Sequence, residues 1–152
     1  MFSVYPSYDI PFVPTSWERL QTMIELSHVN YGSKSVDLGS GDGRVVIAMA
    51  RLGANAEGYE IDKGRAALGQ KNIKKKGLEN KAIIYNKSFW HIDLGSYDII
   101  TLYGITSIME RLEEKIYKEV KPGTKITSNF FPFPTLIPLI KKQSIYLYMP
   151  QE

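Results

Sequence analysis

Cysteine is absent from this chain of 152 residues, and histidine occurs only twice. Without cysteine the chain cannot form a disulfide framework, bind zinc through thiolates or use a cysteine nucleophile. Two histidines are too few for a histidine-rich metal centre. We therefore expect no metal site, and we exclude every reaction that depends on a catalytic thiol.

Long apolar runs are absent as well. No stretch approaches the roughly 18 to 20 apolar residues of a membrane-spanning helix, and the first ten residues, MFSVYPSYDI, lack a basic leader followed by an apolar core. We expect a cytoplasmic protein without a membrane span. The net charge of +3 permits an acidic partner but does not require one.

The length, with 43% apolar and 23% charged side chains, fits one compact globular domain. No internal repeat or long linker divides the chain. We expect a single domain over residues 1–152, with three parts of different composition. These are an aromatic and proline-rich arm at 1–14, a core at 15–131, and a proline-rich tail with an edge strand at 132–152.

Short apolar segments alternate with segments of helical periodicity, which predicts an α/β fold with a parallel sheet covered by helices. The expected strands are 35–38, 56–61, 82–85, 97–103, 124–130 and a last, antiparallel strand at 144–149, at or near an edge. The expected helices are 15–28, 44–52, 62–76 and 105–120. Three prolines between residues 132 and 138 exclude a regular helix in the tail.

The first helix has the clearest start signal. Thr15 followed three residues later by Glu18 is typical of a capping box. Trp17, Leu20 and Met23 then follow at helical spacing, and we expect all three on the buried face.

A glycine turn, GSGDG at residues 39–43, follows the strand at 35–38 directly and leads into a helix. Glycines allow the backbone to pass close to a ligand, and the helix start offers free N–H groups. The third glycine of a dinucleotide fingerprint is replaced by Arg44, and no Gly-Lys-Ser/Thr sequence makes a P-loop. Asp37 and Asp42 would repel a pyrophosphate, but they suit a ligand that carries an ammonium and a sulfonium group.

A second carboxylate position lies 21 residues after Gly39, at the end of the second strand, where Glu60 stands. A carboxylate there can accept hydrogen bonds from both hydroxyls of a ribose, as in dinucleotide-binding folds. The predicted ligand is a nucleoside with a cationic, amino-acid-like tail.

These segments resemble class I S-adenosylmethionine-dependent methyltransferases, through VDLGSGDGR at 36–44 and GYE at 58–60. More narrowly, PFVPT at 11–15, DIITLY at 98–103 and VKPGT at 120–124 resemble the small archaeal broad-specificity protein-lysine methyltransferases and their mitochondrial relatives. The resemblance implies a Rossmann-like class I fold, with a mostly parallel twisted sheet, helices on both faces and a shortened C-terminal part. It also implies S-adenosylmethionine as methyl donor and exposed protein lysines as acceptors.

The same resemblance implies a set of site residues. Those implied to bind the cofactor are Asp37, Gly39 and Gly41 at its methionine end, Glu60 at the ribose, and Ile61, Ser88 and Phe89 around the adenine. Those implied to face the methyl-transfer pocket are Phe12, Thr15 and Tyr103, with Tyr103 positioning the nucleophile. In the family an acidic residue commonly binds the adenine amine, and here Ser88 stands near that place.

Three functions remain open. Beside a monomeric protein-lysine methyltransferase stand an RNA or DNA methyltransferase and a partner subunit that binds the cofactor without catalysis. The lysines at 71 and 74–76 favour a solvated helix face over a nucleic-acid contact, although they lend the second function some weight. The Asn/Asp-Pro-Pro-Tyr/Phe motif of base-amine methylation is absent, because TLYG occupies its place at 101–104.

Overall fold

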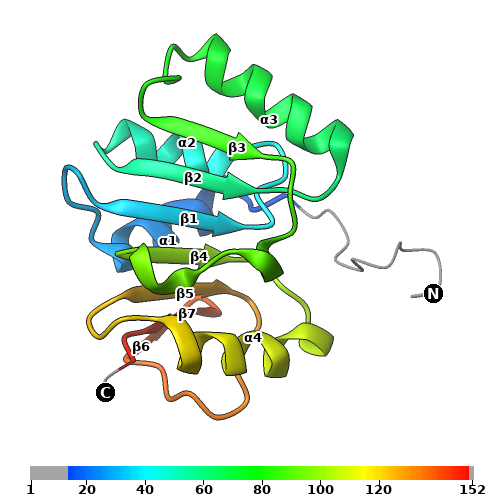
Figure 1. The fold of residues 1–152 in the computed structure, drawn as a ribbon. Coiled ribbons are helices and arrows are strands. Elements are labelled where there is room, and N and C mark those ends of the chain that lie inside the picture. The colour runs from blue at the N-terminus through cyan, green and yellow to red at the C-terminus, as the bar shows by residue number, and fades with distance from the viewer. Residues whose placement is uncertain (1–13, 151–152) are drawn as a thin grey trace.

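The computed structural model describes residues 14–150, so Phe12 and the rest of residues 1–13 lie outside the described part of the chain. A seven-stranded sheet has the order β3-β2-β1-β4-β5-β7-β6 (Figure 1). The strands are β1 (Lys34–Leu38), β2 (Asn55–Tyr59), β3 (Ala82–Tyr85), β4 (Ile99–Leu102), β5 (Lys125–Asn129), β6 (Ile140–Lys142) and β7 (Ile145–Tyr148). The first five pair in parallel, and β7 runs antiparallel to both β5 and β6. Strand order reverses between β1 and β4, which is where open α/β sheets bind ligands.

Helices cover both faces of the sheet, as predicted (Figure 1). They are α1 (Trp17–Ser27), α2 (Arg44–Arg51), α3 (Lys63–Lys75) and α4 (Thr106–Glu119). Two separate hydrophobic clusters reflect this arrangement. One includes Val46 of α2 and Ile84 of β3, and the other includes Met109 and Leu112 of α4 with Ile100 of β4.

The face that carries α4 is only partly covered. Two short 3-10 helices, η2 (Phe89–His91) and η3 (Leu94–Ser96), stand between β3 and β4. In the described residues no longer helix lies over β2 and β3 on this face (Figure 1), and Ile83 of β3 is 46% exposed there. The sheet surface itself therefore forms part of the outside of the molecule.

The shortening of the C-terminal part concerns its helices, because its strands β6 and β7 are present. Within residues 14–150 no helix connects β5 to β6, and the carboxylate of Glu113 on α4 holds the connecting segment instead. It accepts hydrogen bonds from the N–H of Thr135 (3.0 Å), the hydroxyl of Thr135 (2.7 Å) and the N–H of Leu136 (2.7 Å). Strand β6 was not predicted, because its three residues are all exposed and show no alternation.

The predictions for the start of α1 were wrong in two respects. Ser16, not Thr15, is the N-cap, and its side chain accepts a hydrogen bond from the N–H of Arg19 at 3.3 Å. Trp17 is 69% exposed instead of buried. It is the first residue of the helix, and the guanidinium of Arg44 lies 5.0 Å from its ring centre, whereas Leu20 and Met23 are buried as expected.

Candidate functional site

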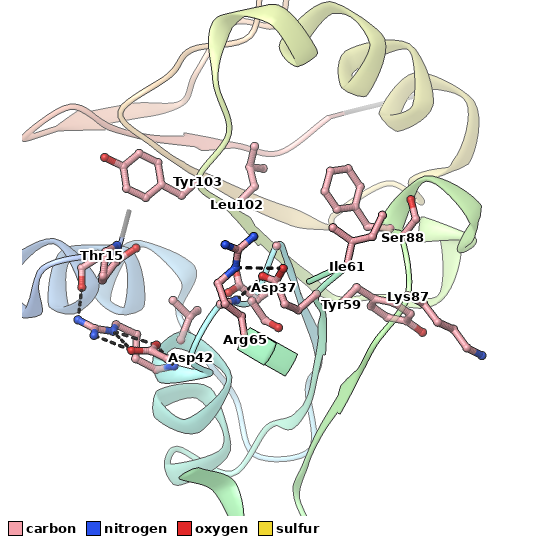
Figure 2. Close-up of a pocket in the computed structure, with 18 of the residues that line it drawn as sticks. Thr15, Asp37, Asp42, Tyr59, Ile61, Arg65, Lys87, Ser88, Leu102 and Tyr103 are labelled. Carbon is pink, nitrogen blue, oxygen red and sulfur yellow. Dashed lines mark hydrogen bonds and ion pairs between the residues drawn. The ribbon is translucent and has the colours of Figure 1, made fainter. Parts of the chain in front are cut away.

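A cavity of about 840 Å³, counted out to its open mouth, lies at the carboxyl ends of β1, β2 and β4 (Figure 2). Nine of the residues singled out from the sequence line it together: Thr15, Asp37, Gly39, Gly41, Glu60, Ile61, Ser88, Phe89 and Tyr103. Figure 2 shows Thr15 and Tyr103 toward one end of the cavity, Ile61 and Ser88 toward the other, and Asp37 between them. Phe12 belongs to the part of the chain that is not described.

The glycine turn leaves its backbone open to the cavity. Gly39 has φ of 86°, and a side chain added there would meet no heavy atom within 4 Å. The N–H groups of Gly39 and Ser40 donate to the carbonyl of Tyr59 at 2.9 and 3.0 Å, which ties the turn to the end of β2. The space beside Gly39 is thus available to a ligand, and the left-handed backbone conformation favours glycine.

Glu60 connects the glycine turn to the segment after β2. Its side chain is buried, with one carboxylate oxygen accepting from the N–H of Gly41 at 2.8 Å and the other from the N–H of Asp62 at 2.9 Å. The Nε of Arg65 lies 3.4 Å from the second oxygen. Because a carboxylate has about four acceptor sites, Glu60 retains capacity to accept hydrogen bonds from a ligand.

Asp37 is a buried carboxyl group at the cavity wall. Its burial raises its pKa to about 7, against the effect of a 2.7 Å hydrogen bond from the hydroxyl of Thr101, and the charges of Glu60 and Asp42 add to the increase. At neutral pH the group is therefore close to half ionised. A cation placed beside it would favour the ionised form, so the site is suited to an ammonium group.

Asp42, in contrast, is neutralised by the protein itself. The Nη2 of Arg44 lies 2.7 Å from its carboxylate, and Nε lies at 3.1 Å. Partial burial acts to raise the pKa of Asp42, but the hydrogen bonds and charge of Arg44 hold it below its ordinary value. The sequence pointed to Arg44 only as the missing third glycine. The sequence did not indicate the second contact of Arg44, in which Nη1 donates to the carbonyl of Thr15 at 2.9 Å.

Sequence reasoning missed a second group of residues that holds Thr15. Asn129, at the end of β5 and fully buried, donates from Nδ2 to the hydroxyl of Thr15 at 3.2 Å and accepts from the Nε of Arg19 at 2.7 Å. The other nitrogens of Arg19 donate to the carbonyls of Gln143 and Ser144 at 2.8 and 3.0 Å. Thr15 is thereby held between the glycine turn, β5 and the turn before β7.

Replacing Asn129 by alanine should lower thermal stability. The substitution leaves both the buried hydroxyl of Thr15 and the Nε of Arg19 without their partner, at a cost of roughly 1–3 kcal/mol. Thermal denaturation measures this effect. Asn55→Ala is the matched control, because Asn55 is exposed and makes one long contact of 3.5 Å. Equal melting temperatures for the two variants would contradict the assignment.

The far end of the cavity is mainly apolar. Ile61 is 39% exposed and Phe89 is buried, while the hydroxyl of Ser88 accepts from the N–H of Trp90 at 3.2 Å and keeps its own proton free to donate. Helix α4 fixes this wall, since the guanidinium of Arg111 lies 4.0 Å from the ring centre of Trp90. An aromatic base would find an apolar surface here with one hydroxyl beside it.

At the end with Thr15, Tyr103 follows β4, with its ring centre 6.3 Å from that of Phe131. Over the described residues, 14–150, no group of three or more histidine, aspartate or glutamate side chains is arranged to hold a metal ion. No helix in that same range is both long and apolar enough to cross a membrane.

The donor set fits S-adenosylmethionine. The buried carboxyl group of Asp37 suits the ammonium, an acceptor at Glu60 suits ribose hydroxyls, the open backbone at Gly39 leaves room for the chain between them, and the apolar wall suits a base.

Comparison with known proteins agrees with this fit. An RNA methyltransferase from Salinibacter ruber, solved with S-adenosyl-L-homocysteine, superposes with a TM-score of 0.85 at 30% identity, covering 92% of this chain and 95% of that one. A protein-lysine N-methyltransferase from Saccharolobus islandicus is 34% identical over 124 residues, 80% of this chain and 77% of that enzyme. The adenine nucleotide translocase lysine N-methyltransferase of Mus musculus is 30% identical over 86% of this chain, which spans 57% of the mouse enzyme's length.

Fold, cavity and solved neighbours together define a class I S-adenosylmethionine-dependent methyltransferase with a Rossmann-like sheet. The model of the ANTKMT methyltransferase domain matches residues 37–140, more than half of the chain. The chain belongs to that family.

Proposed function

We propose that this enzyme is a protein-lysine N-methyltransferase that acts on exposed lysine side chains. The observation that carries the proposal is the 34% identity, over 77% of its length, to the Saccharolobus islandicus enzyme of that name. The mouse relative is also a lysine N-methyltransferase by name. The proposed acceptors are proteins, and the proposed reaction is methyl transfer to the lysine amine.

The cofactor-binding roles follow from the cavity. We assign Asp37, Gly39 and Gly41 to the methionine end of S-adenosylmethionine and Glu60 to its ribose. The adenine lies against residues at the apolar end, namely Ile61, Ser88 and Phe89. In support, all of these residues line the cavity, and Glu60 and Ser88 keep hydrogen-bonding capacity toward it.

The acceptor lysine needs a neutral amine. At pH 7 deprotonating a lysine of pKa about 10.4 costs about 4.6 kcal/mol. When bound, S-adenosylmethionine supplies an electrophilic methyl group next to a positive sulfonium. That neighbouring positive charge disfavours a charged amine. The protein then needs no dedicated base, because the proton can leave to water, and it contributes mainly by positioning the amine in line with the methyl group.

Thr15 and Tyr103 are the proposed acceptor-facing residues of the described chain. Tyr103 stands at the carboxyl end of β4, and its ring can hold an ammonium or methylammonium group by cation–π attraction. We expect Tyr103→Ala to reduce kcat by about tenfold without altering S-adenosylmethionine affinity, whereas Tyr103→Phe should retain most activity. Steady-state kinetics and calorimetry measure these effects, and full activity in the alanine variant would exclude Tyr103 from the site.

RNA is the second candidate acceptor, because the Salinibacter ruber structure at 30% identity is that of an RNA methyltransferase. The two candidates separate in one experiment. Purified protein is incubated with labelled S-adenosylmethionine and whole lysate, and the products are treated with protease or nuclease. Label that disappears with protease and maps to lysine supports the proposal, while label that survives protease and disappears with nuclease overturns it in favour of RNA.

A further inference from the structure

Positive charge is concentrated at one free edge of the sheet, around β3. Residues 63–87 contain eight basic side chains and a single acidic one, Glu79, whereas the whole chain has a net charge of +3. The rest of the chain is therefore net negative. Such segregation of charge is typical of a surface that binds a polyanion.

Helix α3 presents its lysines to solvent along one face. Lys71, Lys74 and Lys75 are spaced three and four residues apart, so they lie side by side on the helix, and all three are exposed. The chain then turns back against the helix end, where the N–H of Lys81 donates to the carbonyl of Leu78 at 2.9 Å. Lys81 therefore stands after this turn, directly before the start of β3.

Strand β3 continues this surface along the edge of the sheet, with α3 beside it (Figure 1). We call the whole set the lysine flank: Lys71, Lys74, Lys75, Lys76, Lys81 and Lys87. Across residues 14–150 none of these lysines forms an ion pair with a carboxylate. On other elements, Lys34, Lys115 and Lys142 each pair with a glutamate. The charges of the lysine flank are thus unmatched by the protein itself.

Aromatic rings accompany two lysines of the flank, Lys81 and Lys87. The Nζ of Lys81 is 4.5 Å from the ring centre of Tyr31, and that of Lys87 is 5.9 Å from the ring centre of Tyr85. Tyr31 is 82% exposed. Sites for single-stranded nucleic acids combine cations for the phosphates with rings on which bases stack. An acidic peptide would use the lysines but would leave the exposed ring without a role.

We propose that the lysine flank, with Tyr31, binds single-stranded nucleic acid without sequence preference, at a site distinct from the methyl-transfer cavity. The cavity opens at the carboxyl ends of the strands, whereas Tyr31 precedes β1 and Lys81 precedes β3 at the opposite ends. Lys87 alone lies at both the flank and the cavity. A strand bound at Tyr31 and Lys81 leaves the cavity open, and this inference does not rest on the identity of the methyl acceptor.

Fluorescence anisotropy with labelled 20-nucleotide oligo(dT) and oligo(U), at 50 to 200 mM salt, tests the proposal on the full chain. The triple variant K74Q/K75Q/K81Q should bind more weakly at 50 mM salt, and its log–log salt slope should be shallower by about 2, from about 0.7 per lost phosphate contact. Tyr31→Leu should weaken binding about tenfold with little change in the slope. The matched control K118Q/K141Q/K142Q removes the same charge from α4 and from β6 at the opposite edge of the sheet, and it should bind like the wild type.

Three results would overturn the proposal: no binding by the wild-type protein at 50 mM salt, equal weakening in both triple variants, or displacement of the oligonucleotide by poly-glutamate at the same charge concentration. The second result would indicate a bulk charge effect, and the third an acidic protein as partner. Thermal denaturation of each variant verifies that it is folded.

Discussion

Asparagine in place of Asp37 is expected to weaken S-adenosylmethionine binding at pH 8 by about 100-fold, through loss of a hydrogen bond between charged groups. The same substitution should make the ligand-free protein more stable to heat. Both effects have one cause, because the buried carboxylate that we propose binds the ammonium of the cofactor is costly to ionise when no cation is present. Calorimetric titration and thermal denaturation, each at pH 8, measure them.

The sign of the stability change depends on pH. The pKa of Asp37 is about 7 in the folded protein and near 3.8 when the chain is unfolded, so the folded state binds more protons between these values. Ionisation therefore reduces stability progressively from about pH 4 to pH 7, and the full penalty is present above pH 7. The melting temperature of Asp37→Asn should exceed that of the wild type at pH 8, and the difference should shrink toward pH 4.

Cofactor affinity should also depend on the ionisation of Asp37. Below pH 7 the wild type must release a proton from Asp37 to bind the cation, so its affinity should fall about tenfold per pH unit, while Asp37→Asn should show no such dependence. Asp93→Asn serves as the control, because Asp93 is exposed and caps η3, a role that asparagine retains. A wild-type affinity that is constant from pH 5.5 to 7 would remove Asp37 from the ammonium site.

Glutamine in place of Glu60 should reduce S-adenosylmethionine affinity by roughly 10- to 100-fold and lower the melting temperature. The two carboxylate oxygens accept from two different backbone N–H groups, those of Gly41 and Asp62. Glutamine has one acceptor oxygen, and its NH₂ group would face whichever N–H the oxygen does not reach. The glycine turn and the segment after β2 would then lose their common anchor.

Calorimetry with S-adenosylmethionine and with S-adenosylhomocysteine measures this loss, and both ligands should be affected equally because they share the ribose. Glu79→Gln, which changes the same side chain at an exposed position, should have no effect. If Glu60→Gln binds both ligands as the wild type does, the ribose assignment is wrong.

Most of the fold could be predicted because its signals are local. The glycine turn stands between a buried strand and a helix, and the five parallel strands are short segments bounded by turn residues. The errors arose where local pattern carries no information. Helical spacing placed Trp17 with Leu20, but it cannot show which side chains of the first turn of α1 remain exposed. Strand β6 exists only because it pairs with β7.

The residues in and around the cavity also fall into those that could be predicted from the sequence and those that could not. Asp37 and Glu60 could be predicted because each closes a strand at the carboxyl edge of the sheet, where parallel strands bring such residues together. Arg19 and Asn129 could not, since they are 110 residues apart and meet only where α1 packs against β5. In the sequence, Arg44 stood out only because it departs from a glycine fingerprint, and nothing there indicated which residue it would contact.

Because one face of the sheet is partly uncovered, two neighbouring positions of β3 differ strongly in how well they tolerate substitution. Ile83 lies on the open side and is nearly half exposed, so polar replacements there should hardly affect folding. Its neighbour Ile84 is buried against Gly43 and Gly69, where even an added methyl group would come within 2.9 and 2.5 Å of its Cδ1. Within β3, Ile83 is thus a position that can vary, whereas a small change in volume at Ile84 disturbs the contact between α3 and the glycine turn.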